Sequence, residues 1–191
     1  MLNRISKAIS LILCFVCLSA LLFSITGCKD EPPALHVFDF GTPEGFDELS
    51  AEEKFEWAKN NGYLVTSYIK ELDKLEIYNE QLLDSFLENK TEPKELLILY
   101  YAPGDVRVSG IYFDGKYYHA TRGRTKTTDA TAFHYYEICR IEYDNGYKFL
   151  CVSNDANLTV KDEFGATLSS DMDYHYDFFK KHYRIATLDK E

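Results

Sequence analysis

The sequence is poor in positive charge. It has 21 lysines and arginines against 31 aspartates and glutamates, a formal net charge of −10. Two of the basic residues, Arg4 and Lys7, lie in the first 27 residues, so a chain without that segment carries −12. Such a surface repels phosphate backbones and anionic lipid head groups, which argues against a nucleic-acid partner and against electrostatic docking on a membrane. The alternative interpretation is that the negative charge of the surface serves only to keep the protein soluble.

The sequence also lacks the common motifs of catalysis and cofactor binding. It contains no Gly-x-Ser-x-Gly elbow, P-loop or dinucleotide fingerprint, and no His-x-x-x-His or Cys-x-x-Cys after position 28. His175 and His182 would lie about 10.5 Å apart on one helix at 1.5 Å per residue, too far for one metal. We therefore predict no cofactor, no metal and no catalytic residue, with an envelope hydrolase whose site the sequence hides as the alternative.

The first 27 residues have the pattern of a secretory signal peptide. A positive start leads into a nearly unbroken apolar run, 8–25, which ends at two small residues. The sequence Ile25-Thr26-Gly27-Cys28 resembles the bacterial lipobox, and that resemblance implies cleavage before Cys28 and acylation of its thiol. Each acyl methylene in the bilayer contributes about 0.8 kcal/mol, so two or three chains would hold the protein firmly.

Two alternatives remain open for this segment. The apolar run is about 18 residues long, just enough to span a bilayer as an uncleaved anchor. An ordinary signal peptide would instead be cut without lipidation. Our interpretation is a lipoprotein held by Cys28 on the extracytoplasmic face of the cell membrane.

The rest of the chain is long enough for one domain with a core. Residues 28–48 are rich in proline and show little periodicity, so we predict an extended tether, with the apolar patch 35–40 free to dock on the domain. Residues 49–191 are predicted to form a single globular domain.

Cysteine is scarce outside the signal segment. Apart from Cys28 there are only Cys139 and Cys151, and an even pair outside the membrane favours a disulfide. Such a bridge would contribute about 3 kcal/mol in the chain-entropy model. No helix start or basic cluster lies beside either residue, which argues against a reactive thiol.

The turn between the two cysteines decides whether they can pair. A three-residue loop with Gly146 in the left-handed position sets Cys139 opposite Cys151. A two-residue Asn145-Gly146 turn sets Cys139 opposite Val152 and weakens the case. We predict the first register and the disulfide.

Two helices are predicted, with a third after Ser169. Ser50 and Glu53 form a capping box at the start of the first, and Gly62 ends it. The second begins at Asn79 as its N-cap and has an apolar face made by 82–87.

Strands are expected at 63–68, 96–101, 106–113, 116–121, 134–143 and 147–153. A tight Asp114-Gly115 hairpin would place His119 opposite Gly110. Helices followed by hairpin-linked strands are typical of an α+β fold, here an antiparallel sheet of about five or six strands packed against two or three helices.

The order of these features resembles a family of small bacterial lipoproteins of unknown function. The shared features are an Asn-Gly start at 61–62, an apolar helix, an apolar strand, a turn similar to "YDGK" at 113–116, and two late cysteines. The similarity covers about residues 51–155. In this chain Tyr63-Leu64 stands where that family has Asp-Val, and Phe113 where it has Tyr. The resemblance implies a fold and a compartment but no activity.

One face of the predicted sheet is a candidate ligand surface. It carries Tyr100, Arg107, Ser109 and Tyr118, with Lys116 beside them. Aromatic rings next to a few polar groups suit sugar rings or peptide backbones. The same tyrosines would also be expected as half-buried strand formers. We predict a non-catalytic binding domain with a carbohydrate or protein partner in the envelope, and basic residues in the loop 122–132 that could meet an anionic wall polymer.

Overall fold

The computed structural model describes residues 33–69, 72, 74–121, 123, 131–168 and 172–190. The chain divides into two compact units, Met1–Ala34 and Leu35–Glu191, and the fold described below is that of the second. The predicted signal segment and Cys28 lie outside the described residues, as do the basic residues of the loop at 122 and 124–130. Among the described residues no helix is both long and apolar enough to cross a membrane.

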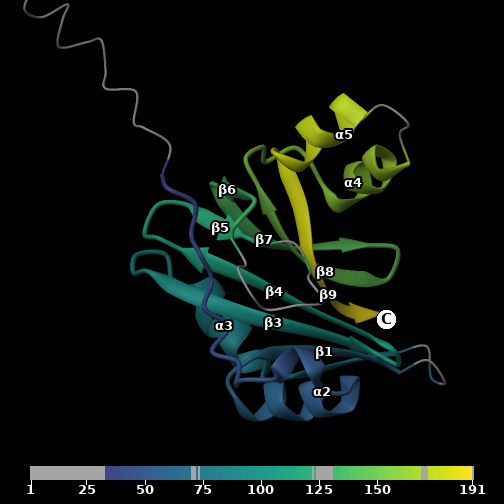
Figure 1. The fold of residues 1–191 in the computed structure, drawn as a ribbon. Coiled ribbons are helices and arrows are strands. Elements are labelled where there is room, and N and C mark those ends of the chain that lie inside the picture. The colour runs from purple at the N-terminus through teal and green to yellow at the C-terminus, as the bar shows by residue number, and fades with distance from the viewer. Residues whose placement is uncertain are drawn as a thin grey trace, which may run out of the picture. The chain divides into compact units, whose positions relative to one another are not determined.

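The described residues form four α-helices, one short 3-10 helix and nine strands (Figure 1). In chain order they are η1 (Phe46–Glu48), α2 (Ala51–Asn60), β1 (Leu64–Ile69), β2 (Lys74–Tyr78), α3 (Glu80–Glu88), β3 (Lys94–Ala102), β4 (Asp105–Phe113), β5 (Tyr118–Ala120), β6 (His134–Tyr136), β7 (Ile138–Asp144), β8 (Tyr147–Ser153), α4 (Val160–Thr167), α5 (Met172–Phe179) and β9 (His182–Lys190).

The strands form two sheets, one of six strands in the order β2-β1-β3-β4-β5-β6 and one of three in the order β7-β8-β9. The α+β class predicted from the sequence is confirmed. The larger sheet is mixed, however, because β1 runs parallel to β3 while its other neighbouring pairs are antiparallel. A parallel pair needs a long crossover, and β2 with α3 provides it.

The main core lies between the two sheets and α3. Leu64, Ile98 and Ile111 from the larger sheet pack in one buried cluster with Phe86 of α3 and Leu150 of β8. Contacts between β2 and β9 and between β1 and β9 also join the two sheets. The inner face of the three-stranded sheet is therefore covered, and α4 and α5 lie on its outer side (Figure 1).

A second core lies on the opposite face of the larger sheet, under α2. As predicted, Leu99 and Val108 point to the side that the helix covers, where they pack with Ala58. The predicted capping box of α2 is also confirmed, since Ser50 Oγ accepts from the Glu53 N–H and Glu53 accepts from the Ser50 N–H.

The segment predicted as a tether belongs in large part to the folded unit, which begins at Leu35 rather than at residue 49. Phe38, Phe40 and Phe46 are buried in the second core. A Cβ added to Gly110 would lie 2.5 Å from Cδ1 of Phe38, so the absent side chain of Gly110 makes room for this ring. The docking expected for the patch 35–40 is confirmed at Phe38 and Phe40, but the tether was predicted too long, because the aromatic residues follow no helical or strand period.

The registers of the β4–β5 and β7–β8 hairpins differ from those predicted. In the β4–β5 hairpin Phe113 faces Tyr118, so His119 lies opposite Tyr112 and not opposite Gly110. The Asp114 carboxylate accepts from the backbone N–H groups of Lys116 and Tyr117, which makes a four-residue loop.

In the β7–β8 hairpin Asp144 faces Tyr147, so the turn has two residues and the alternative register is the observed one. Asn145 and Gly146 both have positive φ, 50° and 76°, as a type I′ turn requires. Cys139 consequently faces Val152.

Several elements had no counterpart in the prediction. These are β2, α4 and β9, and the expected strand 134–143 is divided into β6 and β7, which belong to different sheets. The last helix ends at Phe179, and His182 begins β9 rather than sharing a helix face with His175.

Candidate functional site

A groove of about 330 Å³ lies between the larger sheet and β9. Its lining comes from β1, β3 and β4 on one side and from residues 183–187 of β9 on the other, with Gly123 at its edge. A side chain at Gly123 would begin 3.5 Å from Ser109 Oγ. The groove is at the lower end of the usual size for small-molecule sites.

Three polar side chains form one row across the groove. In the strand register Thr66 pairs with Tyr100, and Tyr100 pairs with Arg107, so all three project from the same face. Ser109 lies in the next row, opposite Ile98. The row therefore offers two hydroxyls and a guanidinium within a few strand spacings.

The charge of the groove is balanced. Arg107 Nη2 lies 3.0 Å from the Asp105 carboxylate, which also lines the groove. Burial and the charge of Asp105 raise the pKa of Tyr100, so its phenol stays protonated and can donate a hydrogen bond at neutral pH. The arrangement presents hydrogen-bonding groups with little net charge.

Thr66 is the unusual member of the row. It is fully buried, yet its Oγ1 has no hydrogen-bond partner among the described residues. A buried hydroxyl left without a partner costs about 1–3 kcal/mol. Thr66 is among the residues that line the groove, so a ligand that displaces the atoms covering its hydroxyl would supply the missing bond.

The structure brings together three of the four residues predicted as the ligand face. Tyr100, Arg107 and Ser109 all line the groove, but Tyr118 does not. With the longer β4–β5 loop, the Tyr118 ring packs at 4.7 Å from Phe113 and at 6.2 Å from Phe86, in the main core. Lys116, also predicted there, lies in the loop, with its Nζ 4.9 Å from the ring centroid of its neighbour Tyr117.

A second polar site lies on the outer face of the three-stranded sheet. His182 of β9 is fully buried between two carboxylates: its Nε2 is 3.0 Å from Glu142 Oε1, and its Nδ1 is 3.4 Å from Glu163 Oε2. The second distance is that of an ion pair without a hydrogen bond, since Nδ1 has no hydrogen-bond partner among the described residues. Glu142 comes from β7 and Glu163 from α4, so the site joins three elements.

Each carboxylate has further donors. Glu142 accepts from the Val160 N–H at 2.6 Å, which satisfies a free donor at the start of α4, and from Arg140 Nε at 2.9 Å. Glu163 accepts from the Arg184 N–H at 2.7 Å. These hydrogen bonds hold α4 against the sheet, and they give both carboxylates donors from the protein in place of water.

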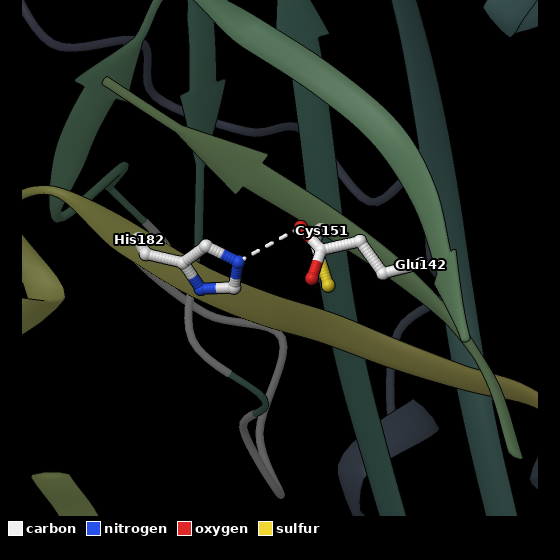
Figure 2. Close-up of side chains that lie close together, drawn as sticks. All are labelled: Glu142, Cys151 and His182. Atoms are coloured by element: carbon white, nitrogen blue, oxygen red, sulfur yellow. Dashed lines mark hydrogen bonds and ion pairs between the residues drawn. The ribbon is translucent and has the colours of Figure 1, made fainter. Parts of the chain in front are cut away.

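Cys151 completes this site. It lies on β8, the central strand, and Figure 2 shows its sulfur close to the Glu142 carboxylate, on the side that His182 Nε2 faces. Ligand atoms of Glu142, Cys151 and His182 all lie within 4.8 Å of one another. We call these three residues together with Glu163 the buried cluster.

The pKa values of the buried cluster describe its charge state. Burial alone would lower the pKa of His182, but the charges of Glu163 and Glu142 and the hydrogen bond to Glu142 outweigh it and raise the pKa. Burial alone would raise the pKa of Glu142, but its bonds from His182 and Val160 outweigh it and lower the pKa. The two carboxylates therefore favour the protonated form of His182.

The thiol of Cys151 remains protonated in this setting. Burial and the charges of Glu142 and Glu163 raise its pKa. A nucleophilic cysteine needs the opposite, a thiolate stabilised by nearby positive charge. The cluster therefore does not have the electrostatics of a Cys–His catalytic pair.

The predicted disulfide is absent from the structure. Cys139 and Cys151 are both free thiols. Cys139 packs against the main core, whereas Cys151 packs with Phe149 and Val160 on the other face of the same sheet. Neighbouring strands put directly paired residues on one face, so the two-residue turn separates the sulfurs.

Sequence reasoning missed the buried cluster because its members are far apart in the chain and match no metal or catalytic spacing. Comparison with known proteins does not supply the missing information: no protein-family model, no curated protein and no solved structure matches the chain. The resemblance to small lipoproteins of unknown function stays a prediction.

Proposed function

We propose that this protein is an envelope lipoprotein, acylated at Cys28 on the outer face of the cytoplasmic membrane, whose domain binds a small neutral saccharide in the groove. The lipobox-like sequence at 25–28 supports the anchor. The observation that carries the binding function is the fully buried Thr66 hydroxyl, which lines the groove and has no partner among the described residues.

The chemistry of the groove selects the class of ligand. Sugars present many hydroxyls, and the row of Thr66, Tyr100 and Arg107 can both donate to and accept from them. Asp105 offsets the charge of Arg107, so an anionic ligand gains little over a neutral one. Tyr100 and Tyr183 line the same groove, and aromatic rings suit the apolar face of a sugar ring.

Thermal unfolding in the presence of ligands tests the binding function. We expect soluble neutral mono- or disaccharides to raise the midpoint, because a ligand at about 100 times its Kd stabilises by about 2.7 kcal/mol. Acidic saccharides and short peptides serve as comparison ligands. Tyr100→Ala and Thr66→Val should remove the shift.

Tyr143→Ala is the matched control. Tyr143 is 72 % exposed and lies at the β7–β8 turn, where it lines a different hollow. It should keep the full shift. The proposal fails if no neutral saccharide changes the midpoint, or if the shift is the same in Tyr100→Ala and in the unaltered protein.

The anchor has its own test. Cells fed with labelled palmitate should label the unaltered protein and not the Cys28→Ser variant, and only the unaltered protein should remain with the membrane fraction. Labelling of both, or of neither, would overturn the lipoprotein part while leaving the groove untouched.

A further inference from the structure

We propose that Glu142, Cys151 and His182 bind one divalent metal ion of the zinc class, with Glu163 holding His182 from behind. The proposal is independent of the saccharide groove. The groove lies between the two sheets, whereas the buried cluster lies on the outer face of the three-stranded sheet. It rests on the geometry of the buried cluster, on the identity of its donor atoms and on the groups that surround them.

The backbone of the three-stranded sheet already brings the three proposed ligands close together. Glu142, Cys151 and His182 come from β7, β8 and β9, one from each strand of the sheet, and each is buried. Their ligand atoms lie within 4.8 Å of one another. Around a tetrahedral zinc with bonds of about 2.0–2.3 Å, ligand atoms are about 3.3–3.8 Å apart. Small side-chain rotations therefore suffice to close the site.

The donor set selects the ion. A sulfur, an imidazole nitrogen and a carboxylate oxygen together suit zinc and similar transition metals, whereas magnesium and calcium require oxygen ligands throughout. Three protein ligands leave the fourth tetrahedral position for a water molecule.

The second ring nitrogen of His182 has the partner that metal sites use. In Figure 2, Nε2 faces Glu142 and Cys151, while Nδ1 points away from the sulfur. Nδ1 lies 3.4 Å from Glu163 Oε2. Metal-bound histidines commonly donate their other N–H to a carboxylate, which fixes the tautomer and the ring orientation. With an ion on Nε2, Nδ1–H would face Glu163 in this role.

The surrounding charges accommodate the exchange. Arg140 and Arg184 lie 2.9 Å and 3.9 Å from the two carboxylates. Metal ligands bind in their deprotonated forms, so a dication at this site displaces the protons that the Cys151 thiol and His182 Nε2 carry.

Metal binding to the full mature chain tests the proposal. We expect the chelator-treated protein to take up one zinc per chain. With Co²⁺ as the probe, it should show the near-ultraviolet charge-transfer absorption of a cobalt–thiolate bond. This absorption reports sulfur ligation directly and needs no variant.

The chain offers a matched pair of cysteine variants. Cys151→Ser should abolish the charge-transfer band and weaken zinc binding at least tenfold, whereas Cys139→Ser should change neither, because Cys139 lies on the other face of the sheet. Glu163→Gln should retain the band and weaken binding about 10–100-fold, as expected when the carboxylate behind a ligating histidine is removed. Circular dichroism confirms folding of each variant.

Three results would overturn the proposal. The first is the absence of stoichiometric zinc uptake by the folded protein, the second is Co²⁺ binding without a thiolate band, and the third is a band that survives in Cys151→Ser. Any of them would leave the buried cluster as an imidazolium held by two carboxylates, with a structural role alone.

Discussion

The groove and the buried cluster both contain buried polar side chains, but they differ in whether these side chains have hydrogen-bond partners. In the cluster, Glu142 and Glu163 accept bonds from backbone N–H groups, and Glu142 also accepts bonds from His182 and Arg140. In the groove, Thr66 has no hydrogen-bond partner among the described residues. The hydrogen bonds of the buried cluster are almost all made within the chain. The groove, in contrast, contains a hydroxyl that makes no hydrogen bond among the described residues.

The difference has an energetic meaning. A buried network whose members are satisfied stabilises and orders the structure, and removing one member leaves the others without partners. A buried hydroxyl without a partner costs free energy that only a ligand, or its replacement by a methyl group, can recover. Substitutions at the two sites should therefore change stability in opposite directions.

The largest effect is expected in the cluster. Glu142→Gln removes the charge between His182 and Arg140 and should lower the free energy of unfolding of the metal-free protein by about 3–5 kcal/mol, because a buried charge loses its partner. Urea denaturation in the presence of a chelator measures it. Glu137→Gln, an exposed change at the start of β7's hairpin, is the control and should stay within about 0.5 kcal/mol. Equal effects in the two variants would contradict a satisfied network.

A pair of threonines isolates the contrast between the sites. Thr66 and Thr121 are both fully buried, but Thr121 Oγ1 accepts a 2.9 Å bond from the Gly110 N–H. Thr121→Val should lower the free energy of unfolding by about 1–3 kcal/mol, because it leaves that N–H unsatisfied. Thr66→Val loses no such bond and should leave the unliganded protein unchanged or more stable. Denaturation midpoints of the two variants measure this difference. A comparable loss of stability in both would show that the Thr66 hydroxyl makes a hydrogen bond.

The smallest effect is expected at the pair of Asp114, which is partly exposed, and His119, which is buried; their side chains lie 2.8 Å apart. Burial alone would raise the pKa of Asp114, but the bonds from His119 and from the turn's backbone outweigh it and lower the pKa. The carboxylate's contribution is therefore fully present above its unfolded pKa of about 3.9 and is lost as the pH falls through the lower folded value.

Stability measured from pH 6 to pH 2 in the unaltered protein and in Asp114→Asn should show this loss. The difference between them should be constant at the upper end of the range and shrink below about pH 4. A difference that stays constant down to pH 2 would mean that the Asp114 pKa is not lowered.

How far the sequence predicts this structure depends on how local each signal is. The α2 capping box and the β3–β4 pairing were predicted correctly, since both are set by neighbouring residues. The two later hairpins were not, because Asp-Gly and Asn-Gly sequences are compatible with more than one loop length. The bonds from the Asp114 carboxylate and the positive φ of Asn145 decide between them.

The candidate sites show the same limit. Tyr100, Arg107 and Ser109 were found because they alternate on paired strands, but β9, which forms the other wall of the groove, had no recognisable pattern. In β7, Arg140 and Glu142 alternate with apolar residues and suggest a face open to water. That face is buried by α4, an element that was not predicted, so the cluster could not be recognised.

The contact between Phe38 and Gly110 joins the start of the folded unit to the middle of its largest sheet. Positions 38 and 110 must therefore co-vary: a related chain with alanine or a larger residue at 110 needs a smaller one at 38. A shortened protein that began at residue 49 would uncover the second core, so recombinant forms have to retain the chain from Leu35 onward.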